Sequence, residues 1–126
     1  MPGEVLAAAV KKHAERLTRF YGIAVDVASD VPAELDGRLA AEAFQIVSEG
    51  LSNVLRHTAA KTAFVSLRGE GSALLLHIGN EASAPPSAAQ GFTPRSIDER
   101  SQALGGSATV EQRADGYTVV QVTLPM

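Results

Sequence analysis

Apolar residues recur at helical spacing in two long stretches of the chain. In residues 5–20 an apolar side chain returns every three or four positions, and Gly22 follows as a stop signal. A second stretch, from about residue 36 to about residue 58, has the same period, so we expect two amphipathic helices. The residues at this spacing in the first helix are Val5, Leu6, Ala9, Val10, His13, Leu17 and Phe20. In the second helix the expected buried stripe is Leu39, Ala43, Ile46, Val47, Gly50 and Val54.

Short alternating runs rich in β-branched residues predict strands between and after these helices. The expected strands are residues 23–27, 63–68, 73–78, 108–113 and 117–124. Residues 29–32 are expected to form a loop, and residues 69–72 and the Asp115-Gly116 pair are expected to form hairpin turns. The apolar run at residues 74–76 predicts that the third strand is central in the sheet.

The sequence changes character after residue 79. Residues 82–91 are small, Pro-rich and uncharged, which predicts a mobile loop. Thr93 then resembles a helix N-cap, with Pro94 at the first helical position. The helix is expected to run to about residue 104, where Gly105-Gly106 ends it.

Helices and strands are therefore mixed along the chain, in the order α-β-α-β-β-loop-α-β-β. This order predicts an α/β (α+β) two-layer sandwich, with a mixed sheet of about five strands and three helices on one face. The length of 126 residues fits a single domain over residues 1–126.

Composition excludes several classes of function. The formal net charge is -3, whereas a nucleic-acid binder should carry a basic patch, so we expect no nucleic-acid partner. The chain has no cysteine, and its three histidines are far apart, so neither disulfides nor a thiolate or histidine metal site is expected. No apolar run approaches the roughly 20 residues that span a bilayer. We expect a soluble, cytoplasmic domain without direct membrane contact. This expectation also holds if the domain is the cytoplasmic part of a membrane-bound sensor.

Polar residues with the chemistry of a metal–phosphate site lie in the second helix. Glu49, Asn53 and Arg56 or His57 are spaced i, i+4 and i+7 or i+8, which places them on one helix face. Glu49 can accept a proton or orient a water, the Asn53 amide oxygen suits Mg²⁺, and Arg56 can neutralise phosphate charge. From spacing alone, a solvated polar face explains the same residues better than a ligand site does.

Residues 45–57 resemble the N-box of histidine kinases, which has the form Q-I-x-x-E-x-L-x-N-x-x-[KR]-H. The resemblance implies a Bergerat ATP-binding fold of the GHKL type. It implies that Glu49 supports phosphoryl transfer and that Asn53 binds Mg²⁺. It also implies that Arg56 contacts phosphate, with His57 at the adjoining basic position.

A second motif lies downstream at residues 95–106. It resembles the R-x-x-x-E-R-x-x-x-L-G-G helix of the nitrate-sensor-like subfamily of these kinases, and a hairpin follows it in both cases. The resemblance implies Mg-ATP as the ligand. It also implies transfer of the γ-phosphate to a histidine on a dimerisation domain of the same kinase, and a response regulator as an indirect partner.

The adenine side departs from the family pattern. The D-x-G-x-G box of the family aligns with residues 80–84, so Asn80 replaces the Asp that binds the adenine amino group, and Ala82 and Ala84 replace the two glycines. The Asn80 amide oxygen can still accept that hydrogen bond, with a loss of about 1 kcal/mol for the missing charge. The second glycine box retains Gly91.

The turn that follows Gly91 is the expected phosphate end of the pocket. Thr93 and Arg95 begin the last helix there, and a helix N-terminus favours phosphate binding.

Three functions are consistent with the sequence. The first is the ATP-binding catalytic domain of a two-component sensor histidine kinase. The second is a degenerate pseudokinase or interaction module with weak or lost ATP binding, which the altered glycine boxes favour. The third is an anti-sigma-type serine kinase, which shares the fold and the N-box but matches the last helix less closely.

Overall fold

The computed structural model describes residues 1–81 and 94–126 of the protein. The loop expected over residues 82–91 and the cap expected at Thr93 lie outside the described residues. The elements, in chain order, are α1 (Pro2–Tyr21), β1 (Ala24–Asp30), α2 (Gly37–His57), β2 (Thr62–Glu70), β3 (Ala73–Glu81), α3 (Arg95–Ala103), β4 (Ser107–Gln112) and β5 (Tyr117–Pro125). No helix in the described part is both long and apolar enough to cross a membrane.

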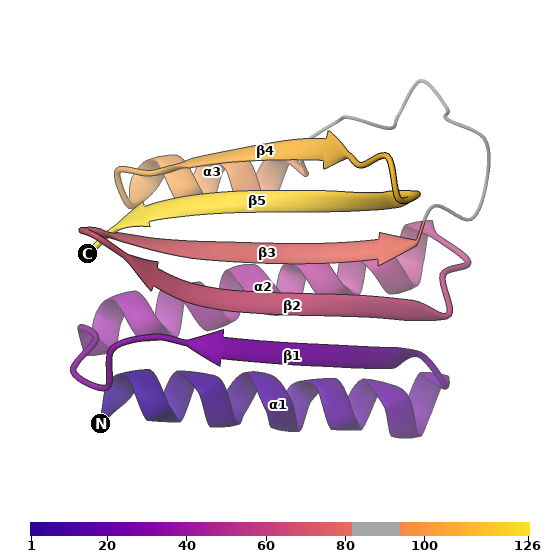
Figure 1. The fold of residues 1–126 in the computed structure, drawn as a ribbon, viewed down its shortest axis with the longest axis horizontal. Helices are drawn as coiled ribbons and strands as arrows, with labels where there is room; N and C mark the ends of the chain where they lie inside the picture. The colour runs from indigo at the N-terminus through magenta and orange to yellow at the C-terminus, as the bar shows by residue number, and fades with distance from the viewer. Residues whose placement is uncertain (82–93) are drawn as a thin grey trace.

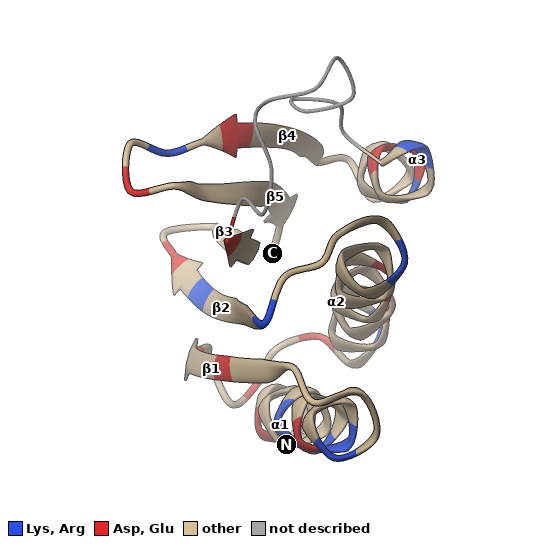
Figure 2. Ribbon diagram, turned by 90° about the vertical axis from the view of Figure 1, so that its right-hand side faces the viewer, with Lys and Arg blue, Asp and Glu red and all other residues tan. Residues whose placement is uncertain are grey.

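The five strands form one mixed sheet in the order β1-β2-β3-β5-β4 (Figure 1). β1 pairs with β2 in parallel, and the other neighbours are antiparallel. The three helices lie on one side of this sheet, which Figure 2 shows end-on. The expected two-layer sandwich is therefore confirmed, and β3 is the central strand, as the run at residues 74–76 predicted.

The long helix α2 supplies much of the core. Asp36 caps its first turn by accepting a hydrogen bond from the Leu39 amide at 3.0 Å. Every position of the predicted apolar stripe is buried. Gly50 lies where α2 approaches β3, because a Cβ at this position would be 3.3 Å from Ile78. The missing side chain therefore allows the helix to pack closely on the sheet.

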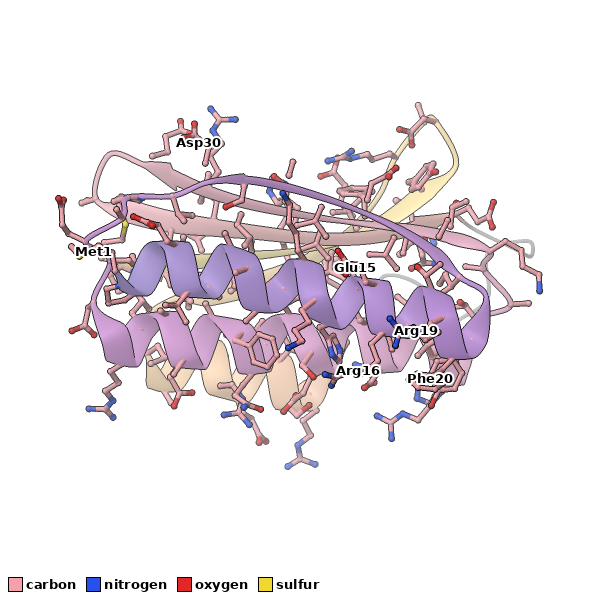
Figure 3. All side chains as sticks on the ribbon, turned by 90° about the horizontal axis from the view of Figure 1, so that it is seen from below. Met1, Glu15, Arg16, Arg19, Phe20 and Asp30 are labelled. Atoms are coloured by element: carbon pink, nitrogen blue, oxygen red, sulfur yellow. The ribbon has the colours of Figure 1, made fainter. Side chains whose placement is uncertain are left out.

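The apolar stripe of α1 is narrower than the sequence predicts. Val5 and Phe20, which fit the helical spacing of apolar residues, are 64% and 67% exposed. Because α1 packs against α2 on one side and the edge strand β1 on another, only a single line of residues is covered. That line is Gly3, Leu6, Val10, Ala14 and Leu17. Figure 3 shows α1 beside α2 from below, with Phe20 at the end of α1 that is far from Met1.

Several strands are longer than predicted. β1 continues through Ser29 and Asp30, which were expected in a loop, because both residues pair with β2 opposite Leu67 and Arg68. Likewise, β2 continues to Glu70, and the hairpin turn is confined to Gly71 and its neighbour, with Gly71 at φ +60°. Ser29, Asp30 and Glu70 have loop-forming compositions around them, but they became strand residues because they pair with a neighbouring strand.

The last helix ends as the double glycine predicts. Gly105 adopts the left-handed conformation at φ +82°, and the Gly106 amide donates to the Ser101 carbonyl at 2.9 Å. This pattern closes the helix with its terminal carbonyls satisfied. The start differs by one residue, because Pro94 is the N-cap and not the first helical residue. The fixed φ of proline suits either position.

Gly106 should not tolerate a side chain. A Cβ there would fall on the carbonyl oxygen of Thr123 and 3.0 Å from Leu124. We expect Gly106→Ala to lower the free energy of unfolding by about 1–3 kcal/mol, since overpacking against backbone cannot be relieved by a rotamer change. Gly37→Ala is the matched control, because its nearest neighbour would be a Pro2 carbon at 3.9 Å. Equal losses for both variants in urea unfolding would contradict the packing argument.

Two histidines are partly buried outside the site described below. His13 packs edge-on against Phe44 with ring centroids 5.8 Å apart, and its Nε2 is buried without a hydrogen-bond partner among the described residues. Burial, and to a lesser extent Arg16, lowers the pKa of His13. For His77, on the uncovered face of the sheet, burial lowers the pKa first, followed by Arg113 and Arg68. Both rings therefore favour the neutral form in the folded protein.

Protonation of these histidines should destabilise the fold. Because their folded pKa values lie below the ordinary value of 6.5, the unfolded chain binds more protons as the pH falls through that value. Stability should therefore be greatest above about pH 6.5 and decrease as the pH falls below that value. Thermal unfolding of the wild type and of His13→Gln/His77→Gln over this range checks this. An equally steep decline in the double variant would assign the effect to other groups.

Candidate functional site

One face of α2 carries the residues that the spacing placed together. Glu49 and Asn53 are partly buried one turn apart, and Arg56 follows as an exposed residue in the last turn. They lie to one side of Gly50 around the helix, so the close packing of Gly50 on Ile78 leaves their side chains outside the core. His57, the last residue of α2, is exposed.

The amide of Asn53 is already in contact with a cation. Arg56 Nη2 donates to Asn53 Oδ1 at 3.3 Å. A metal ion bound at Oδ1 would have to displace this guanidinium, which would then be free to meet a phosphate. A purely structural explanation also exists for Arg56 and His57, because positive charge in the last turn complements the helix dipole.

Two residues of α3 hold Glu49 by hydrogen bonds. Ser96 Oγ donates to Glu49 Oε2 at 2.6 Å, and Arg100 Nη2 donates to Glu49 Oε1 at 3.0 Å. Arg100 Nη1 also donates to Glu42 Oε2 at 3.2 Å. The two carboxylates raise the pKa of Arg100, chiefly through the hydrogen bond with Glu49, so the guanidinium remains charged. A negatively charged side chain thus lies at the N-terminal turn of α3, where the helix dipole favours it.

Sequence reasoning missed three of these residues: Glu42, Ser96 and Arg100. A partial signal was present, because Glu42 and Glu49 are spaced i, i+7 and therefore share one side of α2. Arg100 was part of the quoted motif but had no role assigned to it. The partner of a charged residue on a different helix depends on how the helices pack, which spacing does not reveal.

Asn80 lies near the end of β3 on the helix-covered face. It is two residues beyond Ile78, and alternate residues of a strand point to the same side, so its side chain projects toward the α2 layer. Asn80 Nδ2 donates to the Glu81 carbonyl at 2.8 Å. This bond directs the amide nitrogen to the backbone, so the amide oxygen is the group that could accept a bond from a ligand.

The other predicted nucleotide contacts divide into two groups. Ala82, Ala84, Gly91 and Thr93 lie outside the described residues. Arg95 is the first residue of α3, 86% exposed, and pairs with Glu99 at 2.9 Å. Its guanidinium is therefore engaged on its own helix.

The described residues are compatible with a metal ion whose coordination is completed by a phosphorylated ligand. No three His, Asp or Glu side chains in residues 1–81 and 94–126 form a cluster that could hold a metal ion. Mg²⁺ commonly binds through one or two protein oxygens, with phosphates and waters completing the octahedron. Asn53 Oδ1 fits that single-oxygen role, so the donor set is compatible with Mg²⁺ bound to a nucleotide.

The fold is similar to those of solved histidine-kinase domains. The blue-light activated histidine kinase of Erythrobacter litoralis EL346 matches 95% of this chain with a TM-score of 0.71 at 23% identity. The chain spans 41% of the length of that protein. The ATP binding domain of PrrB from Mycobacterium tuberculosis matches 94% of this chain, and 92% of its own length, with a TM-score of 0.67 at 20% identity.

A third similar structure is the catalytic domain of the histidine kinase ThkA. It matches 97% of this chain and 92% of its own length, with a TM-score of 0.70 at 16% identity. No protein-family model and no curated relative matches the sequence. At these identities the structural likeness establishes the fold, which is that of histidine-kinase ATP-binding domains.

Proposed function

We propose that the chain is the ATP-binding catalytic domain of a two-component histidine kinase, related to the nitrate-sensor-like subfamily. In this proposal it binds Mg-ATP and presents the γ-phosphate to a histidine on a dimerisation domain of the same kinase. A response regulator then receives the phosphoryl group, and the domain acts in the cytoplasm. The observation that carries the proposal is that Glu49, Asn53 and Arg56 lie on one face of α2, where Arg56 donates to Asn53. Glu49 on this face also accepts a hydrogen bond from Ser96 at the start of α3.

Each side chain has a chemical role suited to phosphoryl transfer. Asn53 offers a neutral oxygen to Mg²⁺, and Arg56, once released from Asn53, offers a cation to phosphate. Glu49 is the carboxylate that orients the acceptor group and takes up its proton when the phosphoryl group transfers. The proposal also assigns contacts with the nucleotide to Gly91, Thr93, Arg95 and His57. Catalysis of this kind depends mainly on position and charge.

Asn80 would bind the adenine end, on the same face of the sheet as Ile78. Its amide oxygen can accept the adenine amino group, although without the negative charge of an aspartate. Ala82 and Ala84 would lie where the family has glycines, and each adds a methyl group that the nucleotide must accommodate. The proposal therefore includes weak ATP binding, with a phosphate end that is better equipped than the adenine end.

A degenerate module that has lost nucleotide binding is the second candidate, and the sequence at residues 80–84 favours it. A degenerate module would retain from a kinase ancestor both the fold and the α2 face with Glu49, Asn53 and Arg56. The two candidates differ in whether the native chain binds Mg-ATP at all.

Asn53→Ala tests the metal role directly. We expect the native chain to bind a non-hydrolysable ATP analogue in the high-micromolar to millimolar range in the presence of Mg²⁺. The variant should bind about tenfold more weakly with Mg²⁺, and binding without the metal should change little.

Isothermal titration with and without Mg²⁺ measures both affinities. Gln102→Ala serves as the control, because Gln102 is exposed and its side chain donates a hydrogen bond to Asp98 of the same helix. No binding of the analogue to the native chain at millimolar concentration would refute the kinase proposal in favour of the degenerate module.

Restoring the family residues should strengthen binding. Asn80→Asp should improve ATP affinity several-fold, since a hydrogen bond to a charged acceptor is about 1 kcal/mol stronger. Adding Ala82→Gly and Ala84→Gly should improve it further by removing two methyl groups beside the ligand. The same titration measures the gain, and GTP provides the control ligand because it lacks the adenine amino group. An equal gain for GTP would show that the substitutions do not act through adenine.

A further inference from the structure

A single arginine between two carboxylates links α2 and α3. Arg100 reaches Glu42 at 3.2 Å and Glu49 at 3.0 Å, two helical turns apart on α2. Ser96, one turn earlier on α3, holds the other oxygen of Glu49 at 2.6 Å. Both oxygens of Glu49 are therefore bound from α3.

This arrangement needs the geometry of arginine. The planar guanidinium carries two NH₂ groups that can face two separate carboxylates at once, whereas a lysine ammonium is a compact point charge. The side chains of Arg100, Glu42 and Glu49 are 36%, 32% and 29% exposed. By comparison, the surface pair Arg68–Glu70 is 59% and 60% exposed, so water screens the Arg100 bridge less.

We propose that Arg100 is the positioning residue for Glu49. It fixes the carboxylate at the N-terminal turn of α3, and Glu42 holds the second NH₂ group of Arg100 so that the guanidinium cannot turn away. A free glutamate would sample many rotamers, and two uncompensated carboxylates would repel an incoming phosphate. This inference rests on the proposed function for its ligand, but the bridge itself makes a prediction that needs no ligand.

The first experiment measures the bridge without nucleotide. Thermal unfolding is followed for Arg100→Gln, Glu49→Gln and the double variant, with Arg68→Gln as the matched control for loss of a surface arginine. We expect the double variant to lose roughly 3 °C less than the sum of the single losses, because each single change breaks the same contact. Additive losses, or equal losses for Arg100→Gln and Arg68→Gln, would overturn the proposal.

The second experiment separates positioning from general stability. Mg-dependent binding of a non-hydrolysable ATP analogue is measured for the same variants below their unfolding temperatures. Arg100→Gln should weaken binding by about three- to tenfold, and the same change in the Glu49→Gln background should have little effect. Arg100→Lys should recover only part of the affinity. An equal loss in both backgrounds would exclude an effect through Glu49.

The two experiments distinguish the possible failures. If the native chain binds no nucleotide, the proposed function fails, and the unfolding measurements alone decide whether Arg100 holds Glu49. If nucleotide binds but the effects of Arg100 and Glu49 are independent, the proposed function stands and the positioning role is overturned. Ser96→Ala, which removes only the 2.6 Å bond, gives a second variant with less risk to folding.

Discussion

The packing of α2 on the central strand β3 is the contact on which the rest of the structure depends. Gly50 lies at its closest point, and even one additional carbon there would meet Ile78 at 3.3 Å. This close approach fixes the rotation of the helix about its own axis. Because Glu49 and Asn53 are neighbours of Gly50 on the helix, the same packing keeps both side chains out of the core, and it brings Glu49 within reach of Ser96 and Arg100 on α3.

Electrostatics then fixes the third helix. α3 is short and contributes only Ile97 and Ser101 to the buried residues, so its apolar contacts alone hold it weakly. The Glu42–Arg100–Glu49 bridge adds partly buried charge contacts on the α2 side, and the Gly105-Gly106 cap connects the helix directly to β4. The carboxylate proposed to act in phosphoryl transfer is thus also part of the contact that joins two helices.

The two ends of the proposed nucleotide site differ in what they retain. The phosphate end combines a carboxylate, an amide and cations from α2 and α3, which are joined by hydrogen bonds of 2.6–3.3 Å. The adenine end has a neutral amide at Asn80 in place of a charge. If phosphate and Mg²⁺ contribute most of the binding free energy, ATP affinity should depend strongly on the metal. Selectivity for adenine should be reduced, because the charged acceptor of the adenine amino group is lost.

Much of the fold was determined by local sequence. The apolar period predicted α2 and its buried stripe, the double glycine predicted the end of α3, and alternation predicted all five strands. The lengths of the strands were not predictable, because Ser29, Asp30 and Glu70 became strand residues only through pairing with a neighbour. The core positions of α1 were only partly predictable, since Val5 and Phe20 fit the helical period but lie outside the narrow line that α2 and β1 cover.

The candidate site shows the same division. Spacing by itself placed Glu49, Asn53 and Arg56 on one helix face, because a regular helix repeats its geometry along the chain. Tertiary structure alone decided that Arg100 and Ser96, about 50 positions later, bind Glu49, and that Glu42 shares the arginine. Contacts within one helix follow from sequence separation, whereas contacts between helices depend on how each helix rotates and approaches the other, which is set by packing across the whole core.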